Sequence, residues 1–334
     1  MPPVLPVGRA FFPLDEELAL LPGALTPWLQ ERLVRLGTRM PFAAAASELA
    51  AGHQVQVSEA TARRATERAG AAYVAVQTAQ AAAIEREAPD PPAGPDRQLL
   101  SVDGAMVPLV GGQWAEVKTL AIGEIGAPVW DARTGEAVVP TTHLSYFSRL
   151  ADAETFTRLA LVETHRRGTA TAGEVAAVAD GAEWEQRCID YHRTDAVRIL
   201  DFPHGAQAVA AVAPVAGGAD PAAQAEWLTE QCHELKHGAP QVVLDRLRAV
   251  DAALAPPAGE EPSPAAATVR TSLSYLEKRQ EQIRYAEFRA AGYPIASGAV
   301  ESANKLVVEA RLKGAGMHWA PHHVNPMVAL RTVA

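Results

Sequence analysis

The sequence predicts an α+β protein, in which a helical N-terminal domain precedes a mixed sheet with helices and an all-α insertion. Three observations support this class. Up to about Glu85, apolar residues recur at helical spacing. From Gln98 the pattern changes to period two and to β-branched residues, which is typical of strands. From about residue 205 to residue 290 the chain is helical again.

The N-terminal helices have the proportions of a helix-turn-helix. Residues 14–36 carry apolar residues at helical spacing with a break at Pro22–Gly23, and residues 41–50 form a second helix. A third helix is expected to start at Ser58, a preferred cap residue, and to stop near Gly70. An ordinary pair of helices explains the pattern equally well. The candidate DNA contacts on the third helix are Ser58, Thr61, Arg64 and Arg68.

The strand pattern begins with a predicted β-hairpin. Residues 98–110 and 114–125 alternate on either side of Gly111–Gly112, a strong turn signal, and residues 138–148 form a third strand. The segments that follow are a helix, a strand, a helix and a strand, at residues 152–168, 174–180, 181–194 and 196–201. Three strands followed by this alternation are the element order of a ribonuclease H-like fold.

Composition shifts divide the chain into five parts. A last helix is expected at residues 296–316, entered through Ser297–Gly298, and Pro/Ala/Gly-rich breaks interrupt the preceding helical region at 214–222 and 255–266. The parts are a helix-turn-helix domain (1–86), a Pro-rich linker (87–97), a ribonuclease H-like core (98–204), a helical insertion (205–290) and the remainder of the core (291–334).

Bulk properties restrict the class of protein. The net charge of -9 and the pI near 5.6 argue against a generally basic DNA-binding surface, although a local basic patch remains compatible with them. Two cysteines, Cys188 and Cys232, exclude a disulfide framework. Because the sequence has neither a run of eighteen apolar residues nor an apolar signal region, we expect a cytoplasmic protein without a membrane partner.

Three carboxylates are candidates for metal binding. Asp103 lies inside the first strand, where a carboxylate is costly unless it binds something, although Asp-Gly alone usually marks a tight turn. Asp180 ends a strand, where ligand groups often lie, although Asp at this position alone more commonly caps the next helix. Glu301 lies one turn into the last helix, where it could simply pair with the helix dipole or Lys305. Together, however, they are the ligands that two hard cations need for phosphoryl transfer.

Three sequence blocks resemble the ISKra group of insertion-sequence transposases, DDE enzymes related to the Mutator type. Residues 99–125 are similar to their first-Asp block, residues 177–184 (AVADGAEW) to the second-Asp block, and residues 295–319 to the block that carries the catalytic Glu. The blocks occur in the family's order, and the resemblance covers nearly the whole chain. The 121 positions from Asp180 to Glu301 imply a helical insertion of the kind found in Mutator-type relatives.

The resemblance implies both an activity and a set of site residues. Asp103, Asp180 and Glu301 are expected to hold two Mg²⁺ or Mn²⁺ ions, and Asp201 and His204 match an Asp-x-x-His element that lies near the active site. In the reaction that the resemblance implies, water attacks a DNA phosphodiester at each transposon end, and the freed 3′-hydroxyl then attacks target DNA. The expected additional DNA contacts are Lys305, Arg311 and Lys313.

The same resemblance suggests the partners and the main alternative. The partners are double-stranded DNA, both the terminal inverted repeats and the target, and further copies of the chain on that DNA, in association with the nucleoid. The cysteine-rich stretch that the family carries ahead of residue 11 is absent, and the family continues beyond residue 334, so we expect a truncated copy. The alternative is therefore an inactive transposase that acts as a DNA-binding protein or repressor. A nuclease unrelated to transposition is a third possibility.

Two histidine-containing segments are interpreted conservatively. Cys232, His233 and His237 would lack a fourth ligand for zinc, so a solvated helix face is favoured. Trp319, with His318 and two further histidines close by, either packs in the core or stacks against an unpaired base.

Overall fold

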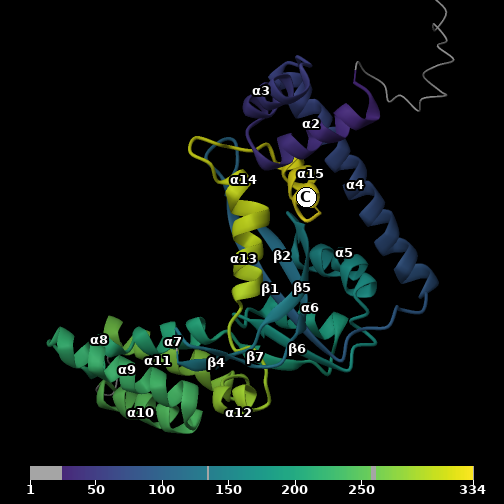
Figure 1. Cartoon of the computed structure of the whole chain (residues 1–334). Helices are drawn as coiled ribbons and strands as arrows, with labels where there is room; N and C mark the ends of the chain where they lie inside the picture. The colour runs from purple at the N-terminus through teal and green to yellow at the C-terminus, as the bar shows by residue number, and fades with distance from the viewer. Residues whose placement is uncertain (1–24, 134, 257–260, 334) are drawn as a thin grey trace, which may run out of the picture.

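The computed structural model describes residues 25–133, 135–256 and 261–333, so the part of the first predicted helix before residue 25 lies outside the described residues. Within these ranges the core is a five-stranded mixed sheet with the order β5-β2-β1-β6-β7 (Figure 1). Strand β2 is antiparallel to both of its neighbours, β5 and β1, whereas β1, β6 and β7 pair in parallel. The α+β class with a mixed sheet is confirmed. The strands are β1 (Arg97–Pro108), β2 (Trp114–Ile125), β5 (Thr141–Arg149), β6 (Glu174–Ala179) and β7 (Val197–Leu200).

The predicted hairpin forms, whereas the predicted third strand starts too early. At the β1–β2 turn, Gly111 and Gly112 have φ angles of +81° and +75°, which glycine adopts without a steric penalty. Val138 belongs to a separate small hairpin of β3 (Val129–Asp131) and β4 (Glu136–Val138), which the sequence pattern did not reveal. Pro140, which has no N–H to donate, separates this hairpin from β5.

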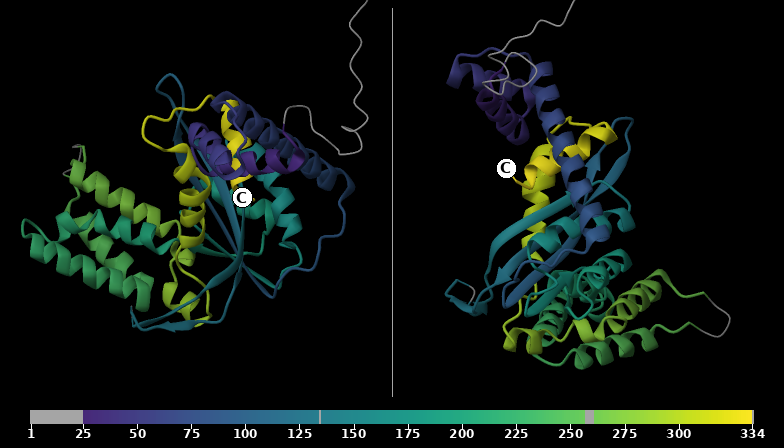
Figure 2. Two further views of the ribbon diagram at one scale, coloured as in Figure 1. Left: turned by 45° about the horizontal axis from the view of Figure 1, so that its top comes forward. Right: turned by 90° about the vertical axis from the view of Figure 1, so that its right-hand side faces the viewer.

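Each face of the sheet has its own cover. On one face α5 (Ala153–Arg166) and α6 (Glu183–His192) bury an apolar layer that includes Leu100, Phe147 and Phe156. The other face carries α13 (Gly298–Ala303) and the helical insertion (Figures 1 and 2). Because strand side chains alternate between faces, Leu99, Ser101 and Asp103 lie on the α13 side.

The region predicted as an insertion consists of helices in the structure and encloses an apolar cluster against β6 and β7. It begins directly after β7, slightly earlier than predicted. Its helices are α7 (Phe202–Ala210), α8 (Ala213–Ala216), α9 (Pro221–His237), α10 (Pro240–Ala253), α11 (Pro264–Glu277), a short 3₁₀ turn at Gln280–Gln282 and α12 (Tyr285–Ala290).

The N-terminal helices are α2 (Pro27–Arg39), α3 (Phe42–His53) and α4 (Glu59–Glu87), and they contact one another. Ser58 caps α4 as predicted, accepting a hydrogen bond from the Thr61 N–H. The expected stop near Gly70 is wrong, since α4 continues for 29 residues. Gly70 instead permits close packing on α15: a Cβ there would lie 2.2 Å from the Pro326 carbonyl oxygen.

The C-terminal segment is less regular than predicted. Helix α13 continues into a π-helical stretch at Asn304–Glu309 and into α14 (Ala310–Leu312). A further helix, α15 (Pro321–Arg331), was not expected; it packs against α4 and β5. Among the described helices, none has the length and apolarity needed to cross a lipid bilayer.

Candidate metal centre

Strand register brings Asp103 and Asp180 together. Strands β1 and β6 pair in parallel as far as Ser101 and Val178, and each aspartate lies two residues further along its strand. Side chains two apart share a face, so both aspartates lie on the face that carries α13. Asp103 is inside the strand, paired with Thr119 of β2, and is not in a turn.

A third carboxylate, from Glu185, completes a cluster with these two. The three residues offer ligand oxygens that all lie within 4.8 Å of one another. Asp103 and Asp180 are partly exposed, whereas Glu185 is only 1% exposed. Its Oε2 atom accepts hydrogen bonds from the N–H groups of Gly181 and Ala182, at 3.1 and 3.3 Å, across the first turn of α6.

The electrostatics of the cluster favour a bound cation. Burial, followed by the hydrogen bond with Asp180 and the nearby negative charges, raises the pKa of Glu185 to about 10. Burial and the charge of Asp180 also raise the pKa of Asp103, while hydrogen bonds from Gly104 and Asn304 oppose that shift. Among the described residues, no lysine or arginine forms an ion pair with any of the three carboxylates.

The loop after β6 is held by the helical insertion. The Tyr275 hydroxyl donates to the Asp180 carbonyl oxygen at 2.6 Å, and the Arg279 guanidinium donates to the Gly181 carbonyl oxygen at 2.6 Å. Burial raises the pKa of Tyr275 to about 12, so this phenol keeps its proton at neutral pH. The Ala182 N–H donates to Asp180 Oδ1 at 2.7 Å and orients that carboxylate.

Asp201 and His204 form a pair beside the cluster. Asp201 is fully buried, and its Oδ2 atom lies 2.7 Å from His204 Nδ1. The hydrogen bond with Asp201 raises the pKa of His204; burial opposes this, and the charges of Asp180 and Asp103 reinforce it. The other Asp201 oxygen accepts from the Ser297 N–H at 2.7 Å, which ties the start of the last helical segment to this pair.

Glu301 lies on α13, outside the group of ligand atoms within 4.8 Å of one another. Its Oε1 atom is 3.3 Å from the Ser297 hydroxyl. Three residues after Glu301, on the same side of the helix, Asn304 donates through Nδ2 to Asp103 Oδ2 at 2.8 Å. The helical segment is thus anchored to the site at both ends, while the Glu301 carboxylate does not join the cluster.

Glu185 is a site residue that was not predicted from the sequence. Its sequence signal is an acidic residue in the first turn of the helix that follows Asp180, which is also the common position of a capping Glu. Its burial and its closeness to Asp103 depend on how α6 packs against β1, which no local pattern records.

The predicted DNA contacts on α4 differ in their accessibility. Ser58 is exposed and Thr61 is half-buried, and their hydroxyl groups bond to each other at the helix cap, with 2.9 Å between the oxygens. Arg64 and Arg68 are exposed and form no ion pair within the described ranges. Lys305 is likewise exposed. The side chains of the two arginines and this lysine are therefore accessible to a phosphate group in solution.

The prediction that Arg311 contacts DNA does not fit the structure. Arg311 is 3% exposed, and its guanidinium carbon lies over the rings of Phe42 and Trp319, 4.7 and 5.1 Å from their centres. It also donates to the Gly37 carbonyl oxygen, so it joins the N-terminal helices to the core. Trp319 is buried, as the core alternative predicted. Lys313 is exposed but pairs with Glu309 at 2.6 Å.

The histidines of α9 form no metal cluster. Throughout the described part of the chain, the only group of three or more metal-type ligands is that of Asp103, Asp180 and Glu185. His237 lies 2.8 Å from Arg289 through Nδ1, and its ring packs against that of His233.

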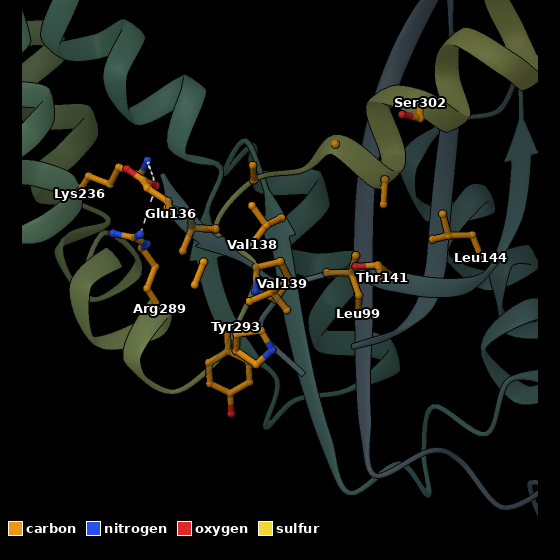
Figure 3. Close-up of a pocket in the computed structure, with 17 residues that line it drawn as sticks. Leu99, Glu136, Val138, Val139, Thr141, Leu144, Lys236, Arg289, Tyr293 and Ser302 are labelled. Carbon is orange, nitrogen blue, oxygen red and sulfur yellow. Dashed lines mark hydrogen bonds and ion pairs between the residues drawn. The ribbon is translucent and has the colours of Figure 1, made fainter. Parts of the chain in front are cut away.

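A cavity of about 480 Å³ lies beside the start of α13 (Figure 3). Leu99, Val138 and Leu144 form part of its apolar wall, and Lys236 and Arg289 meet Glu136 at its edge. None of the three clustered carboxylates lines this cavity.

No protein-family model matches the chain, and no curated protein matches it.

Proposed function

We propose that the protein is a DDE transposase that cleaves DNA at the ends of an insertion sequence and joins those ends to target DNA. One observation carries the proposal: Asp103 and Asp180, on adjacent parallel strands, converge with a third carboxylate within 4.8 Å. The resemblance of the sequence blocks around Asp103, Asp180 and Glu301 gives this chemistry its substrate.

The arrangement of the sheet is compatible with a ribonuclease H-like core. Three antiparallel strands, then a helix, a strand, a helix and a strand, place the central strand β1 beside β6. In open α/β sheets, ligands bind outside the carboxyl ends of parallel strands. Asp180 lies at such an end, next to Asp103 of β1.

The donor set fits hard divalent cations. Carboxylate oxygens are the ligands that Mg²⁺ and Mn²⁺ prefer, and no basic side chain of the described residues is paired with them. When bound, the ions would activate the attacking oxygen and stabilise the charge that develops on the phosphate. Asp103 and Asp180 would hold them, and Glu301 would approach from α13 once DNA is bound.

The remaining residues of the site orient groups and hold protons. Asp201 fixes the His204 ring through Nδ1, so that Nε2, which has no hydrogen-bond partner within the described residues, can donate to a phosphate oxygen. Because the pKa of His204 is raised, the ring carries more positive charge near neutral pH. Tyr275 and Arg279 hold the backbone that carries Asp180.

A second candidate function is a DNA-binding protein or repressor without cleavage activity. The position of Glu301 outside the carboxylate cluster favours it, because a triad in which Glu301 stays apart would be inactive. Both functions use the same helix-turn-helix, so DNA binding alone does not separate them.

A cleavage assay tests the proposal. The protein is incubated with labelled double-stranded DNA from both flanks of its own coding sequence, with Mg²⁺ or Mn²⁺. We expect specific nicks at repeat ends, and we expect Asp103→Asn and Asp180→Asn each to lower the rate by about a hundredfold or more. Asp96→Asn, at an exposed position just before β1, is the matched control and should cleave normally.

The outcomes distinguish the candidates. Binding to the flanking DNA without cleavage in either metal would support the repressor. Cleavage without preference for the repeat ends would indicate an unrelated nuclease.

A further inference from the structure

We propose that Glu185 and Asn304, together with Asp103 and Asp180, form a single binding site for one divalent cation, Mg²⁺ or Mn²⁺, before any DNA is present. The inference rests on the proposed function for its role in catalysis, but cation binding itself can be measured without DNA. It makes Glu185, rather than Glu301, the third carboxylate on this ion.

The spacing of the three carboxylates suits one ion. Mg²⁺–oxygen bonds are about 2.1 Å long, so two oxygens on opposite sides of one ion are about 4.2 Å apart. The ligand atoms of Asp103, Asp180 and Glu185 lie within 4.8 Å of one another, close to this limit. A small movement of the partly exposed Asp103 and Asp180 side chains is enough to bring all three carboxylates within bonding distance of one ion.

Glu185 is held in place for this role by the backbone. The N–H groups of Gly181 and Ala182 donate to Oε2, and Glu185 also shares a hydrogen bond with the Asp180 carboxylate. A cation that replaces the shared proton would take oxygens of both carboxylates as ligands. The Tyr275 and Arg279 side chains hold the carbonyl groups of Asp180 and Gly181, so the same loop also fixes Asp180. Both carboxylates therefore approach the site from a rigid support.

Asn304 provides an independent indication of a ligand. The residue is only 6% exposed, and its amide is held against the cluster by the bond from Nδ2 to Asp103 Oδ2. Its Oδ1 atom has no hydrogen-bond partner, which is costly for a buried carbonyl oxygen. If the amide turns by half a turn when a cation binds, Oδ1 faces the cluster and joins Asp103 as a ligand, and Nδ2 gives up its bond to Asp103.

The test is Mn²⁺ binding to DNA-free protein, followed by the electron paramagnetic resonance signal of free Mn²⁺. Wild-type protein should bind the ion, and Glu185→Gln and Asn304→Leu should each weaken binding by about tenfold or more. In Glu185→Gln, the side-chain oxygen can still accept from the Gly181 and Ala182 N–H groups. Glu183→Gln is the matched control: its side chain, in the same helical turn, is 91% exposed, and it should bind Mn²⁺ like wild type.

Thermal unfolding in EDTA and in excess Mn²⁺ checks the fold of each variant. Wild-type protein should gain thermal stability from Mn²⁺, as expected for a ligand of the folded state, and Glu185→Gln should lose most of that gain. If Glu185→Gln is unfolded in EDTA, the Mn²⁺ affinity of Asn304→Leu is compared with that of wild type instead.

Wild-type affinity in Glu185→Gln, or no Mn²⁺ binding by DNA-free wild-type protein, would overturn this inference. Neither result depends on the cleavage assay. Protein that binds Mn²⁺ through Glu185 but never cleaves DNA would overturn the proposed function and leave the cation site standing.

Discussion

Gly181, directly after Asp180, is required by two separate features of the site. Its φ angle is +87°, which only glycine adopts freely, and a Cβ there would lie 2.2 Å from Arg279 Nε. An added methyl group therefore strains the backbone and displaces the guanidinium that holds the loop.

We expect Gly181→Ala to lower the free energy of unfolding by about 2–3 kcal/mol. Because Asp180 moves with the loop, the variant should also bind Mn²⁺ more weakly. Gly111→Ala is the matched control, since Gly111 has a similar φ of +81° but open space around its Cβ. Urea unfolding of both variants measures the difference, and equal losses would show that the contact with Arg279 costs nothing.

His192 makes the stability of the protein depend on acidity. Its Nδ1 atom lies 3.1 Å from the Thr164 hydroxyl oxygen, and its Nε2 atom is buried without a partner. Burial lowers the pKa of His192 from 6.5 to about 4. Between these two values only the unfolded chain takes up the proton, so acidification through this window favours unfolding.

His192→Gln should therefore reduce the loss of stability between pH 6.5 and pH 4 by up to about 3 kcal/mol relative to wild type. The measurement is urea unfolding at several pH values. His318→Gln, at an exposed position, controls for the loss of a histidine elsewhere. If the free energy of unfolding changes with pH in the same way in wild type and His192→Gln, the lowered pKa of His192 is contradicted.

At the scale of secondary structure, the crossing of α4 and α15 joins the N-terminal helices to the sheet. Helix α4 runs past Gly70 to contact both α15 and α5. At Gly70 a Cβ would meet the backbone of Pro326, with the carbonyl carbon at 2.6 Å as well as the oxygen at 2.2 Å. Backbone cannot rotate away as a side chain can, so the helices would have to separate.

Gly70→Ala should accordingly destabilise the protein by about 2–3 kcal/mol, although alanine has the higher helix propensity. Gly52→Ala, in α3, should be neutral or stabilising by up to about 1 kcal/mol, because no atom lies within 4 Å of its Cβ position. Thermal or urea unfolding decides between them. Stabilisation by both substitutions would mean that the two helices do not pack this closely.

The π-helical stretch Asn304–Glu309 has a local consequence for the site. A π-helical turn changes the direction of side chains relative to a regular α-helix, and such turns are frequent at functional sites. Here the stretch begins at Asn304, the residue whose amide contacts Asp103.

For the molecule as a whole, the sheet lies between the N-terminal helices and the insertion (Figure 2). Arg311 links α2 and α3 to the C-terminal segment through Gly37, Phe42 and Trp319. In the proposed transposase, DNA bound at α4 would extend from these helices toward the carboxylates, which requires that the two parts keep their relative position.

We predict that Arg64→Ala and Arg68→Ala each weaken binding to repeat-end DNA and lower the dependence of affinity on salt. A cation that contacts phosphate releases counterions, so its loss reduces the slope by about one unit. Arg86→Ala is the matched control on the same helix, because Arg86 is already paired with Glu87 at 2.6 Å. Fluorescence anisotropy at several salt concentrations is the measurement, and unchanged slopes would remove this helix from the interface.

The local pattern of the sequence was sufficient for the types of the main helices and strands, but it did not predict the β3–β4 hairpin, α15 or the π-helical stretch. Period-two alternation identified β1 and β2, and the strand–helix–strand order from β6 to β7 agrees with their parallel pairing, because short crossovers join parallel strands. The pairing of β1 with β6, which places Asp103 next to Asp180, joins segments that are separated in the chain by β2, β5 and α5. The Ser58 cap could be predicted because its signal involves residues close in the chain.

Only the tertiary structure decided what depends on contacts between distant segments. The burial of Glu185 follows from the packing of α6 on β1, the burial of Arg311 from the N-terminal helices, and the continuation of α4 past Gly70 from its crossing with α15. The location of Glu301 outside the cluster depends on how α13 packs on β1 and β2. Periodicity and capping signals predict the helix or strand to which a residue belongs. Its burial and its place in a metal site depend on the other elements that pack against that helix or strand.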